Sequence, residues 1–108
     1  MRPAYNTTKH AVVGLTRCVA LENAKNNINV NAICPGIVET DIVRNAAARM
    51  EEAGLSQEES RQMIESQIPM GRMLQPLEVA NIAVYLARAE SDGMTGQTIT
   101  ISGGMRMG

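Results

Sequence analysis

The sequence of 108 residues contains no phenylalanine and no tryptophan, only two tyrosines, and no long apolar run. Without large aromatic side chains, its core depends on aliphatic residues and on eight methionines, which pack adaptably but specify geometry less sharply. A membrane-spanning helix needs roughly 20 apolar residues, and no such run is present. The first residues also lack the features of a secretory signal. We therefore expect a soluble, cytoplasmic protein that does not use a membrane.

Neither sign of charge is in excess, since 10 basic residues face 11 acidic ones and the net charge is −1. No broad basic field exists to attract nucleic acid or anionic lipid, so these partners are not expected. The two cysteines, Cys18 and Cys34, have no metal-like spacing, and few other candidate ligands accompany them. We expect small buried hydrophobic residues in a reducing compartment, rather than a disulfide or a metal site. The length fits one domain, residues 1–108, with no second domain.

The first element expected from the pattern is a helix from Tyr5 to about Asn26. This stretch has no proline, and apolar residues recur at helical spacing in a broad stripe, which predicts a helix buried on more than one side. The stripe consists of Ala11, Val12, Leu15, Cys18, Val19 and Leu21. The pair of asparagines at 26–27 breaks the pattern. Residues 28–36 then alternate apolar and polar and end at a Pro-Gly pair, as a strand does.

The middle of the chain differs in character. Residues 41–67 are polar, charged and helix-favouring, and Gly54 and Ser56 interrupt them. This pattern predicts two short helices in a mobile surface segment. Pro76 then suits a helix start, and Glu78 suits the positive end of the helix dipole. An apolar face follows, formed by Val79, Ile82, Ala83, Leu86 and Ala87. Residues 97–102 alternate again and predict a second strand before a Gly-Gly pair.

The order of elements indicates an α/β fold. A strand–helix–strand unit normally closes a right-handed parallel crossover. Because parallel strands are buried on both faces and need neighbours, two of them are too few to stand alone. The pattern therefore predicts the C-terminal portion of a doubly wound parallel sheet, incomplete as given. Such a portion would expose much apolar surface, so we expect a partner or aggregation.

Tyr5 and Lys9 stand out as a chemical pair. They lie four residues apart at the start of the expected helix, on one face. A nearby cation and a helix N-terminus both stabilise a phenolate, and a tyrosine so tuned can pass a proton to or from a substrate oxygen. The same spacing also occurs where an aromatic ring merely packs against a lysine stem. His10 follows, but helical geometry turns it about 100° from Lys9, which favours packing or solvent exposure.

Several motifs in order and register resemble those of the short-chain dehydrogenase/reductase family, over the whole chain. They are YNTTK at 5–9, INVNAICPGIVET at 28–40, PMGR at 69–72, TGQ at 95–97 and SGG at 102–104. The resemblance implies a Rossmann-like fold and hydride transfer between NAD or NADP and a ketone or secondary alcohol. It makes Tyr5 the catalytic acid/base and also a cofactor contact. Lys9 would bind the nicotinamide ribose and stabilise the phenolate.

The resemblance also assigns a cofactor-binding loop. Pro35 and Gly36 would turn the chain at the carboxyl end of the strand, where ligands bind in open α/β sheets. The backbone of Val38 and the side chain of Thr40 would contact the nicotinamide amide and a nearby phosphate. Thr40 equally suits a helix N-cap, and one residue can do both. Residues 41–67 would be the substrate-binding lid.

Arg72 and Glu78 are expected to pair as a structural clasp.

The chain also departs from the family pattern. No Gly-rich phosphate-binding turn is present, and the family's catalytic serine would lie upstream of the first residue. The residues that distinguish NAD from NADP belong to the same missing part, and the chain alone is expected to be nearly inactive. We therefore expect part of a longer oxidoreductase that forms a homo-dimer or tetramer and acts on a small carbonyl or alcohol. The alternatives are a non-catalytic fragment that binds full-length subunits, and a small helical domain with a chance Tyr-Lys pair.

Overall fold

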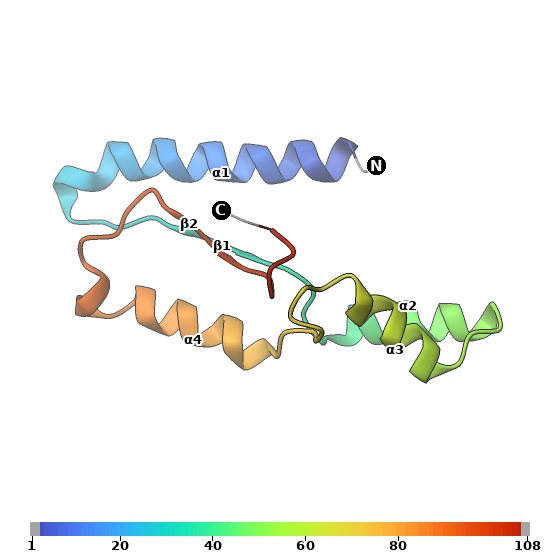
Figure 1. Ribbon diagram of the computed structural model, residues 1–108. Helices are drawn as coiled ribbons and strands as arrows, with labels where there is room; N and C mark the ends of the chain where they lie inside the picture. The colour runs from blue at the N-terminus through green and yellow to red at the C-terminus, as the bar shows by residue number, and fades with distance from the viewer. Residues whose placement is uncertain (1–2, 107–108) are drawn as a thin grey trace. The chain divides into compact units, whose positions relative to one another are not determined.

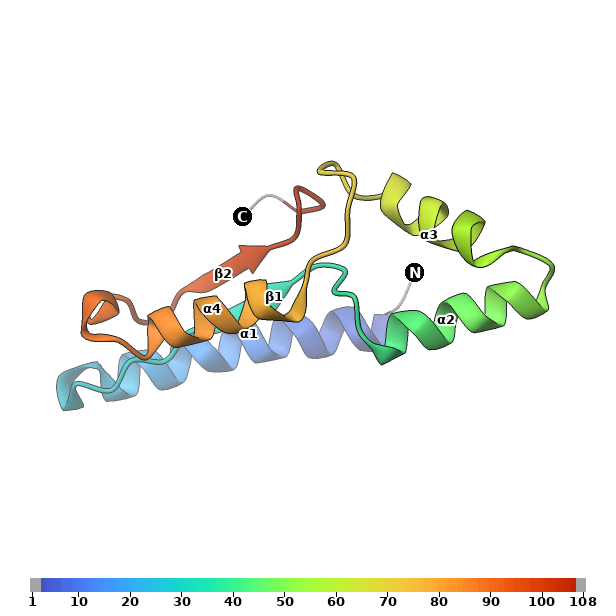
Figure 2. The ribbon, with the colours of Figure 1, turned by 90° about the horizontal axis from the view of Figure 1, so that it is seen from below.

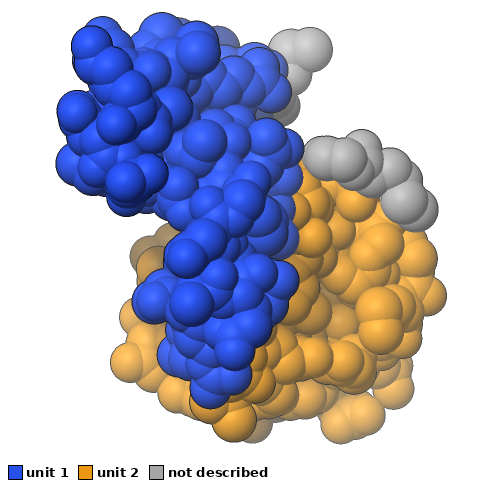
Figure 3. Space-filling model, turned by 90° about the vertical axis from the view of Figure 1, so that its left-hand side faces the viewer, with its two compact units in different colours: residues 1–34, 82–99 blue, residues 35–81, 100–108 orange. Residues whose placement is uncertain are grey.

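The structure is a computed structural model that describes residues 3–106 and has two compact units (Figure 1). One unit comprises the described residues up to Cys34 together with Ile82–Ile99, and the other comprises Pro35–Asn81 together with the described residues from Thr100 on (Figure 3). The elements in chain order are α1 (Pro3–Asn23), η1 (Ala24–Asn26), β1 (Ala32–Pro35), α2 (Asp41–Glu52), α3 (Gln57–Ser66), α4 (Pro76–Leu86), η2 (Ala89–Ser91) and β2 (Thr98–Ile101). The expected order of helices and strands is confirmed.

The two strands β1 and β2 form one two-stranded sheet (Figure 2). Ala32 N–H donates to the carbonyl of Gln97, and Gly36 N–H donates to that of Ile101. Residue numbers therefore rise together along both strands, and the pairing is parallel. The crossover expected from the sequence is present.

Helix α1 ends as the two asparagines predict. The α-helix stops at Asn23, a 3₁₀ turn follows, and Asn27 adopts a left-handed backbone with φ 58°. Asparagine tolerates this conformation better than most residues, so the chain can turn here towards β1.

The expectation that α1 is buried on more than one side is wrong for this chain. Its buried residues are Thr16 and Ala20. Ala20 lies under the turn before β2, where a Cβ added to Gly96 would be 3.4 Å from the Ala20 Cβ. Leu15 and Leu21 are largely exposed, at 63% and 80%. The small residues of the helix therefore make the close contact, and much of the apolar stripe stays uncovered.

The cysteine prediction also needs correction. Both cysteines are free thiols, but Cys18 is exposed and Cys34 is only half-buried. Cys18 belongs to the apolar stripe of α1, which the helical spacing of the sequence assigned to the interior. Because this stripe is uncovered, Cys18 is exposed.

The strands are shorter than predicted from residues 28–36 and 97–102. Residues 28–31 are not part of β1, because asparagine side chains take over the pairing there. Asn29 Nδ2 donates to the carbonyl of Asp92, and Asn31 Nδ2 donates to that of Met94, both at 3.0 Å. The Asn31 side-chain oxygen accepts from Gln97 N–H at 3.0 Å. The polar positions of the alternating pattern therefore bind the loop before β2.

The second unit has a small core of its own. Ile68, Met73 and Leu74 are at most 5% exposed, and they lie on the segment that connects α3 to α4. Helices α2 and α3 form a hairpin, and the side chain of Ser56 caps α3 by accepting from Glu59 N–H. The two short helices expected in 41–67 are confirmed. Helix α4 begins at Pro76 as expected, but none of its residues is fully buried.

Candidate functional site

The end of β1 packs tightly on the end of β2 in the second unit. A Cβ added to Gly36 would lie 2.9 Å from Ser102 Cα, and Gly36 N–H donates to the carbonyl of Ile101 at 2.8 Å. Such a distance to backbone is too short for any side chain, so this position requires glycine. Pro35, just before it, is exposed. The turn expected at Pro35-Gly36 is not observed, because Pro35 is the last residue of β1 and Gly36 continues the pairing with β2.

Two residues after Gly36, Val38 forms an isolated parallel bridge to Leu74. Leu74 N–H donates to the carbonyl of Ile37, and Glu39 N–H donates to the carbonyl of Leu74, both at 2.9 Å. In a parallel bridge, the N–H and C=O of the central residue point away from the partner strand. Within the described residues, the N–H and C=O of Val38 have no hydrogen-bond partner. Val38 thus offers one free donor and one free acceptor.

Thr40 is the next residue with a free polar group. It occupies the N-cap position of α2 with an extended backbone, at φ −133° and ψ 174°, but its side chain makes no capping hydrogen bond. The N-cap interpretation is therefore correct for the backbone and not for the hydroxyl. The first N–H groups of a helix have no intrahelical acceptor and attract anions. The hydroxyl and the start of α2 lie together at this end of the loop.

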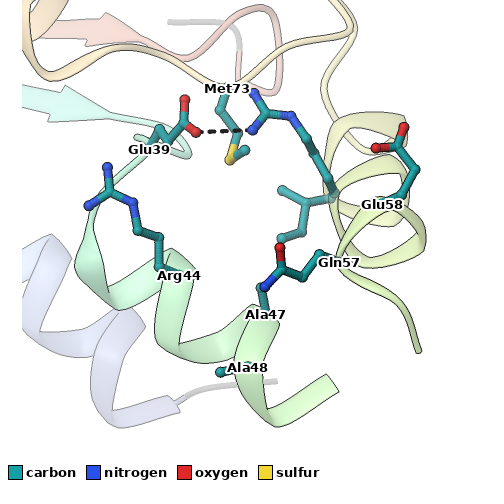
Figure 4. Close-up of a pocket in the computed structure, with 9 residues that line it drawn as sticks. Glu39, Arg44, Ala47, Ala48, Gln57, Glu58 and Met73 are labelled. Carbon is teal, nitrogen blue, oxygen red and sulfur yellow. Dashed lines mark hydrogen bonds and ion pairs between the residues drawn. The ribbon is translucent and has the colours of Figure 1, made fainter. Parts of the chain in front are cut away.

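A cavity of about 460 Å³ lies between helices α2 and α3. Figure 4 shows Glu39 and Met73 at one end of it and Ala48 at the other. The lining residues are Glu39, Arg44, Ala47, Ala48, Gln57, Glu58, Arg61, Ile64 and Met73. Its charged groups are balanced in sign, and the remaining side chains are apolar except for Gln57. Neither Val38 nor Thr40 lines it.

The most connected side chain of the site is Glu39. Its Oε1 accepts from Arg61 Nη1 of α3 at 3.0 Å, and its Oε2 accepts from Gln75 Nε2 at 2.9 Å. The hydrogen bond from Gln75, followed by the bond and the charge of Arg61, holds the pKa of Glu39 below its usual value. The carboxylate is therefore ionised at neutral pH.

The clasp expected between Arg72 and Glu78 is confirmed. The guanidinium donates two hydrogen bonds to the carboxylate, at 2.8 and 3.0 Å, and Gln75 N–H donates to the same carboxylate at 2.7 Å. Arg72 first, and the Gln75 backbone second, lower the pKa of Glu78 to about 2. Glu78 thereby fixes the backbone of the residue that holds Glu39.

The predicted catalytic pair lies on the first turns of α1, in the other unit. Tyr5 is 52% exposed and Lys9 is half-buried. The His10 ring is exposed, with Nδ1 2.8 Å from the carbonyl oxygen of Asn6, as expected for a residue outside the site. One unit therefore carries Tyr5 and Lys9, and the other unit carries the residues of the loop after β1.

The second unit brings Gly36, Val38 and Thr40 into one loop, as the sequence predicts. The links of Glu39 to Arg61 and Gln75 were missed, because the partners lie 22 and 36 residues away in sequence. The only local signal was the glutamate between two predicted cofactor contacts. Within residues 3–106, no group of three or more acidic, histidine or cysteine side chains could hold a metal ion. No helix in that range is long and apolar enough to cross a membrane.

Comparison with known proteins gives a consistent result. A family model described as Enoyl-(Acyl carrier protein) reductase matches residues 1–106. A diacetyl reductase, (S)-acetoin forming, of Staphylococcus aureus is 46% identical over 103 residues, which are 94% of this chain and 40% of that protein.

Solved structures agree. A short chain dehydrogenase family protein from Francisella tularensis is 38% identical with a TM-score of 0.89, over 94% of this chain and 43% of that one. An actinorhodin polyketide ketoreductase with NADPH is 39% identical with a TM-score of 0.81, over 94% of this chain and 39% of that one. The chain thus spans about two fifths of the length of these proteins. The expected fold class, part of a Rossmann-like doubly wound α/β sheet, is confirmed.

Proposed function

Because the chain belongs to the short-chain dehydrogenase/reductase family, we propose that it is part of an oxidoreductase that transfers a hydride between NAD or NADP and a small ketone or secondary alcohol. The observation that carries the proposal is the loop after β1. It offers the unpaired N–H and C=O of Val38 and the uncapped hydroxyl of Thr40 within three residues. The loop therefore has free hydrogen-bonding groups of both kinds next to a helix start.

These groups fit a nicotinamide dinucleotide. A carboxamide has one acceptor and one donor group, which match the free N–H and C=O of Val38. The Thr40 hydroxyl and the start of α2 suit a phosphate. Gly36 has no side chain, and Pro35 ends the strand that brings the chain to this edge. When bound, the cofactor supplies or accepts the hydride.

In this proposal, Tyr5 and Lys9 carry out the proton transfer that accompanies the hydride transfer. Tyr5 donates its phenolic proton to the carbonyl oxygen of a substrate that is being reduced, and it recovers the proton in the opposite direction. Lys9 stabilises the phenolate by its charge and binds the nicotinamide ribose hydroxyls. Both residues lie on α1, four positions apart, so they share one face of the helix.

The substrate class follows from the relatives. The relative from Staphylococcus aureus is named for diacetyl, and the structural neighbour is named for a polyketide ketone. We propose a small carbonyl substrate and residues 41–67 as the substrate-binding lid. Diacetyl is the first compound to test.

A second candidate function is subunit binding without catalysis. The observation that favours it is the uncovered apolar surface of α1, where Val12, Leu15 and Leu21 are each more than half exposed. In the enzyme, the same surface would support a homo-dimer or tetramer. The free thiols Cys18 and Cys34 are consistent with a reducing compartment, and we propose a cytoplasmic location.

The test is cofactor binding and turnover by the complete gene product. NADH and NADPH are titrated by nicotinamide fluorescence, and diacetyl reduction is followed at saturating cofactor. Tyr5→Phe should lower kcat by at least about 100-fold, because general acid catalysis contributes that much. Adding Lys9→Ala should also weaken cofactor binding.

Tyr85→Phe is the matched control, because Tyr85 is the other tyrosine and is exposed to a similar extent, 45% against 52%. It should leave kcat unchanged. A wild-type protein that binds neither cofactor at millimolar concentration would rule the proposal out. The subunit-binding function would then be the one to pursue, by pull-down with a full-length member of the family.

A further inference from the structure

Glu39 lies in sequence between Val38 and Thr40, which are proposed to bind the cofactor, but its own side chain makes different contacts. Val38 and Thr40 present their free groups within the loop, whereas the carboxylate of Glu39 lines the cavity between α2 and α3. In an extended segment, successive side chains point to opposite sides. The side chain of Glu39 therefore points to the side opposite to the Thr40 hydroxyl, and neither backbone group of Val38 bonds to it.

Three hydrogen bonds hold Glu39. Its N–H donates to the carbonyl of Leu74 at 2.9 Å, and each carboxylate oxygen accepts from one side chain, Gln75 or Arg61. Leu74 is 3% exposed, and the Glu39 side chain is 23% exposed. Backbone and side chain are thus restrained at once, which fixes the orientation of this residue.

The partners of Glu39 are themselves held in place. Gln75 N–H donates to Glu78, which forms the two-bonded pair with Arg72. On the other side, Arg61 also donates through Nε to Glu65 of the same helix at 2.9 Å. A continuous series of polar contacts therefore runs from the start of α4, through Glu39, to α3.

The cavity beside α3 determines how much these polar contacts matter for the position of this helix. Glu39 and Arg61 both line the cavity. The space between this ion pair and the far end of the hairpin is therefore not filled by packed apolar side chains. Figure 4 shows the bond of Glu39 to the guanidinium at the same end as Met73, with Ala47 and Ala48 farther along α2. A helix beside a cavity can shift more easily than one packed in a core. The bond to Glu39 is therefore one of the restraints on α3 at this end.

We propose that Glu39 is a positioning residue that ties lid helix α3 to the loop of Val38 and Thr40, so that lid position and cofactor binding depend on each other. This inference rests on the proposed function and deepens it, because it assigns a residue that joins the cofactor loop to the lid. Glu39 touches neither substrate nor cofactor and acts through its two neighbours.

A merely structural ion pair would behave differently. Partly exposed pairs contribute little to global stability, so loss of Glu39 should leave the melting temperature nearly unchanged. A misplaced binding group, in contrast, has a large effect on ligand binding. The two roles therefore separate when binding and stability are measured on the same variants.

The experiment compares Glu39→Ala, Glu39→Gln, Arg61→Ala and the double variant Glu39→Ala/Arg61→Ala in the complete gene product. Glu90→Gln is the control for loss of one negative charge, because Glu90 is exposed and makes no hydrogen bond within residues 3–106. The measurements are the Kd for NADH and NADPH, the KM and kcat for diacetyl, the melting temperature, and hydrogen–deuterium exchange of residues 57–66.

We expect Glu39→Ala to raise the cofactor Kd and the substrate KM by about tenfold, with a smaller change in kcat, because the binding groups are displaced while the reacting groups are intact. Exchange in α3 should rise by a similar factor. Glu39→Gln retains one acceptor oxygen and should recover part of the effect. The double variant should be no worse than Glu39→Ala, since both changes cut one link.

Two outcomes would overturn the inference. The first is a cofactor Kd within twofold of wild type in Glu39→Ala while wild type binds normally. The second is unchanged exchange of residues 57–66, which tests the tie to α3 whether or not cofactor binds. Failure of wild type itself to bind NADH and NADPH would instead count against the proposed function, so the two failures are distinguishable.

Discussion

Helix α1 and the α2–α3 hairpin are both helical, but they are stabilised in different ways. Along its 21 residues, α1 buries only Thr16 and Ala20 and leaves apolar side chains in the open. The hairpin has charged and polar surfaces linked by ion pairs, such as Arg44 with Asp41 and Arg61 with Glu65. An apolar surface needs a cover, whereas a polar one is stable in water. The difference indicates that α1 depends more on further contacts than the hairpin does.

Leu21 and Ile42 give the sharpest test of this difference, because each is 80% exposed, one on α1 and one on α2. We expect Leu21→Glu to destabilise the assembled protein by about 2–3 kcal/mol, because the introduced carboxylate would be buried there without an ion-pair or hydrogen-bond partner. Ile42→Glu should change stability by less than about 0.5 kcal/mol, as surface changes do. Urea denaturation and size-exclusion chromatography measure both effects. Equal effects of the two variants would remove the distinction between the helices.

Two glycines contrast the packing of α1 with that of the segment directly after β1. Gly36→Ala places a Cβ 2.9 Å from the backbone of Ser102 and should destabilise by about 1–3 kcal/mol. Gly14→Ala on α1 meets nothing within 4 Å and should stabilise by about 0.5–1 kcal/mol through helix propensity. Thermal unfolding of both variants gives the sign. Destabilisation by Gly14→Ala would show that a neighbour approaches α1 closely at that residue.

The smallest expected effect concerns the Arg72–Glu78 clasp and pH. The pKa of Glu78 is lowered from 4.5 to about 2 in the folded state, so its contribution to stability is complete above about pH 4.5 and is lost as pH falls towards 2. Glu78→Gln should therefore be less stable than wild type at neutral pH, and the gap should close in acid. Melting temperatures between pH 7 and pH 2.5 measure the gap. A gap that is constant over this range would contradict the clasp as a charged pair.

The sequence predicted those features whose causes are local. The turn at the asparagines, the break between α2 and α3 near Gly54 and Ser56, the start of α4 at Pro76 and the clasp from 72 to 78 each depend on residues within one or two helical turns. The motif loop also supplied Gly36, Val38 and Thr40 as candidates, which the structure brings into one segment.

The features that could not be predicted depend on contacts between distant segments. The start of β1 is set by the bonds of Asn29 and Asn31 to a loop 63 residues away. Glu39 gained its role from Arg61 and Gln75, and no spacing rule links such positions. The exposure of Cys18 follows from what covers α1, and the periodicity of one helix does not contain that information.

The asparagine contacts have a consequence for how the chain folds. Asn29 and Asn31 act as extra hydrogen-bonding groups that join the segment before β1 to the loop before β2, over a sequence separation of 63 residues. Closing so long a loop costs more chain entropy than closing the α2–α3 hairpin, whose helices are nearly adjacent in sequence. Contacts of high sequence separation form slowly. We therefore expect the hairpin to form first during refolding, and the asparagine contacts to close the sheet in a late step.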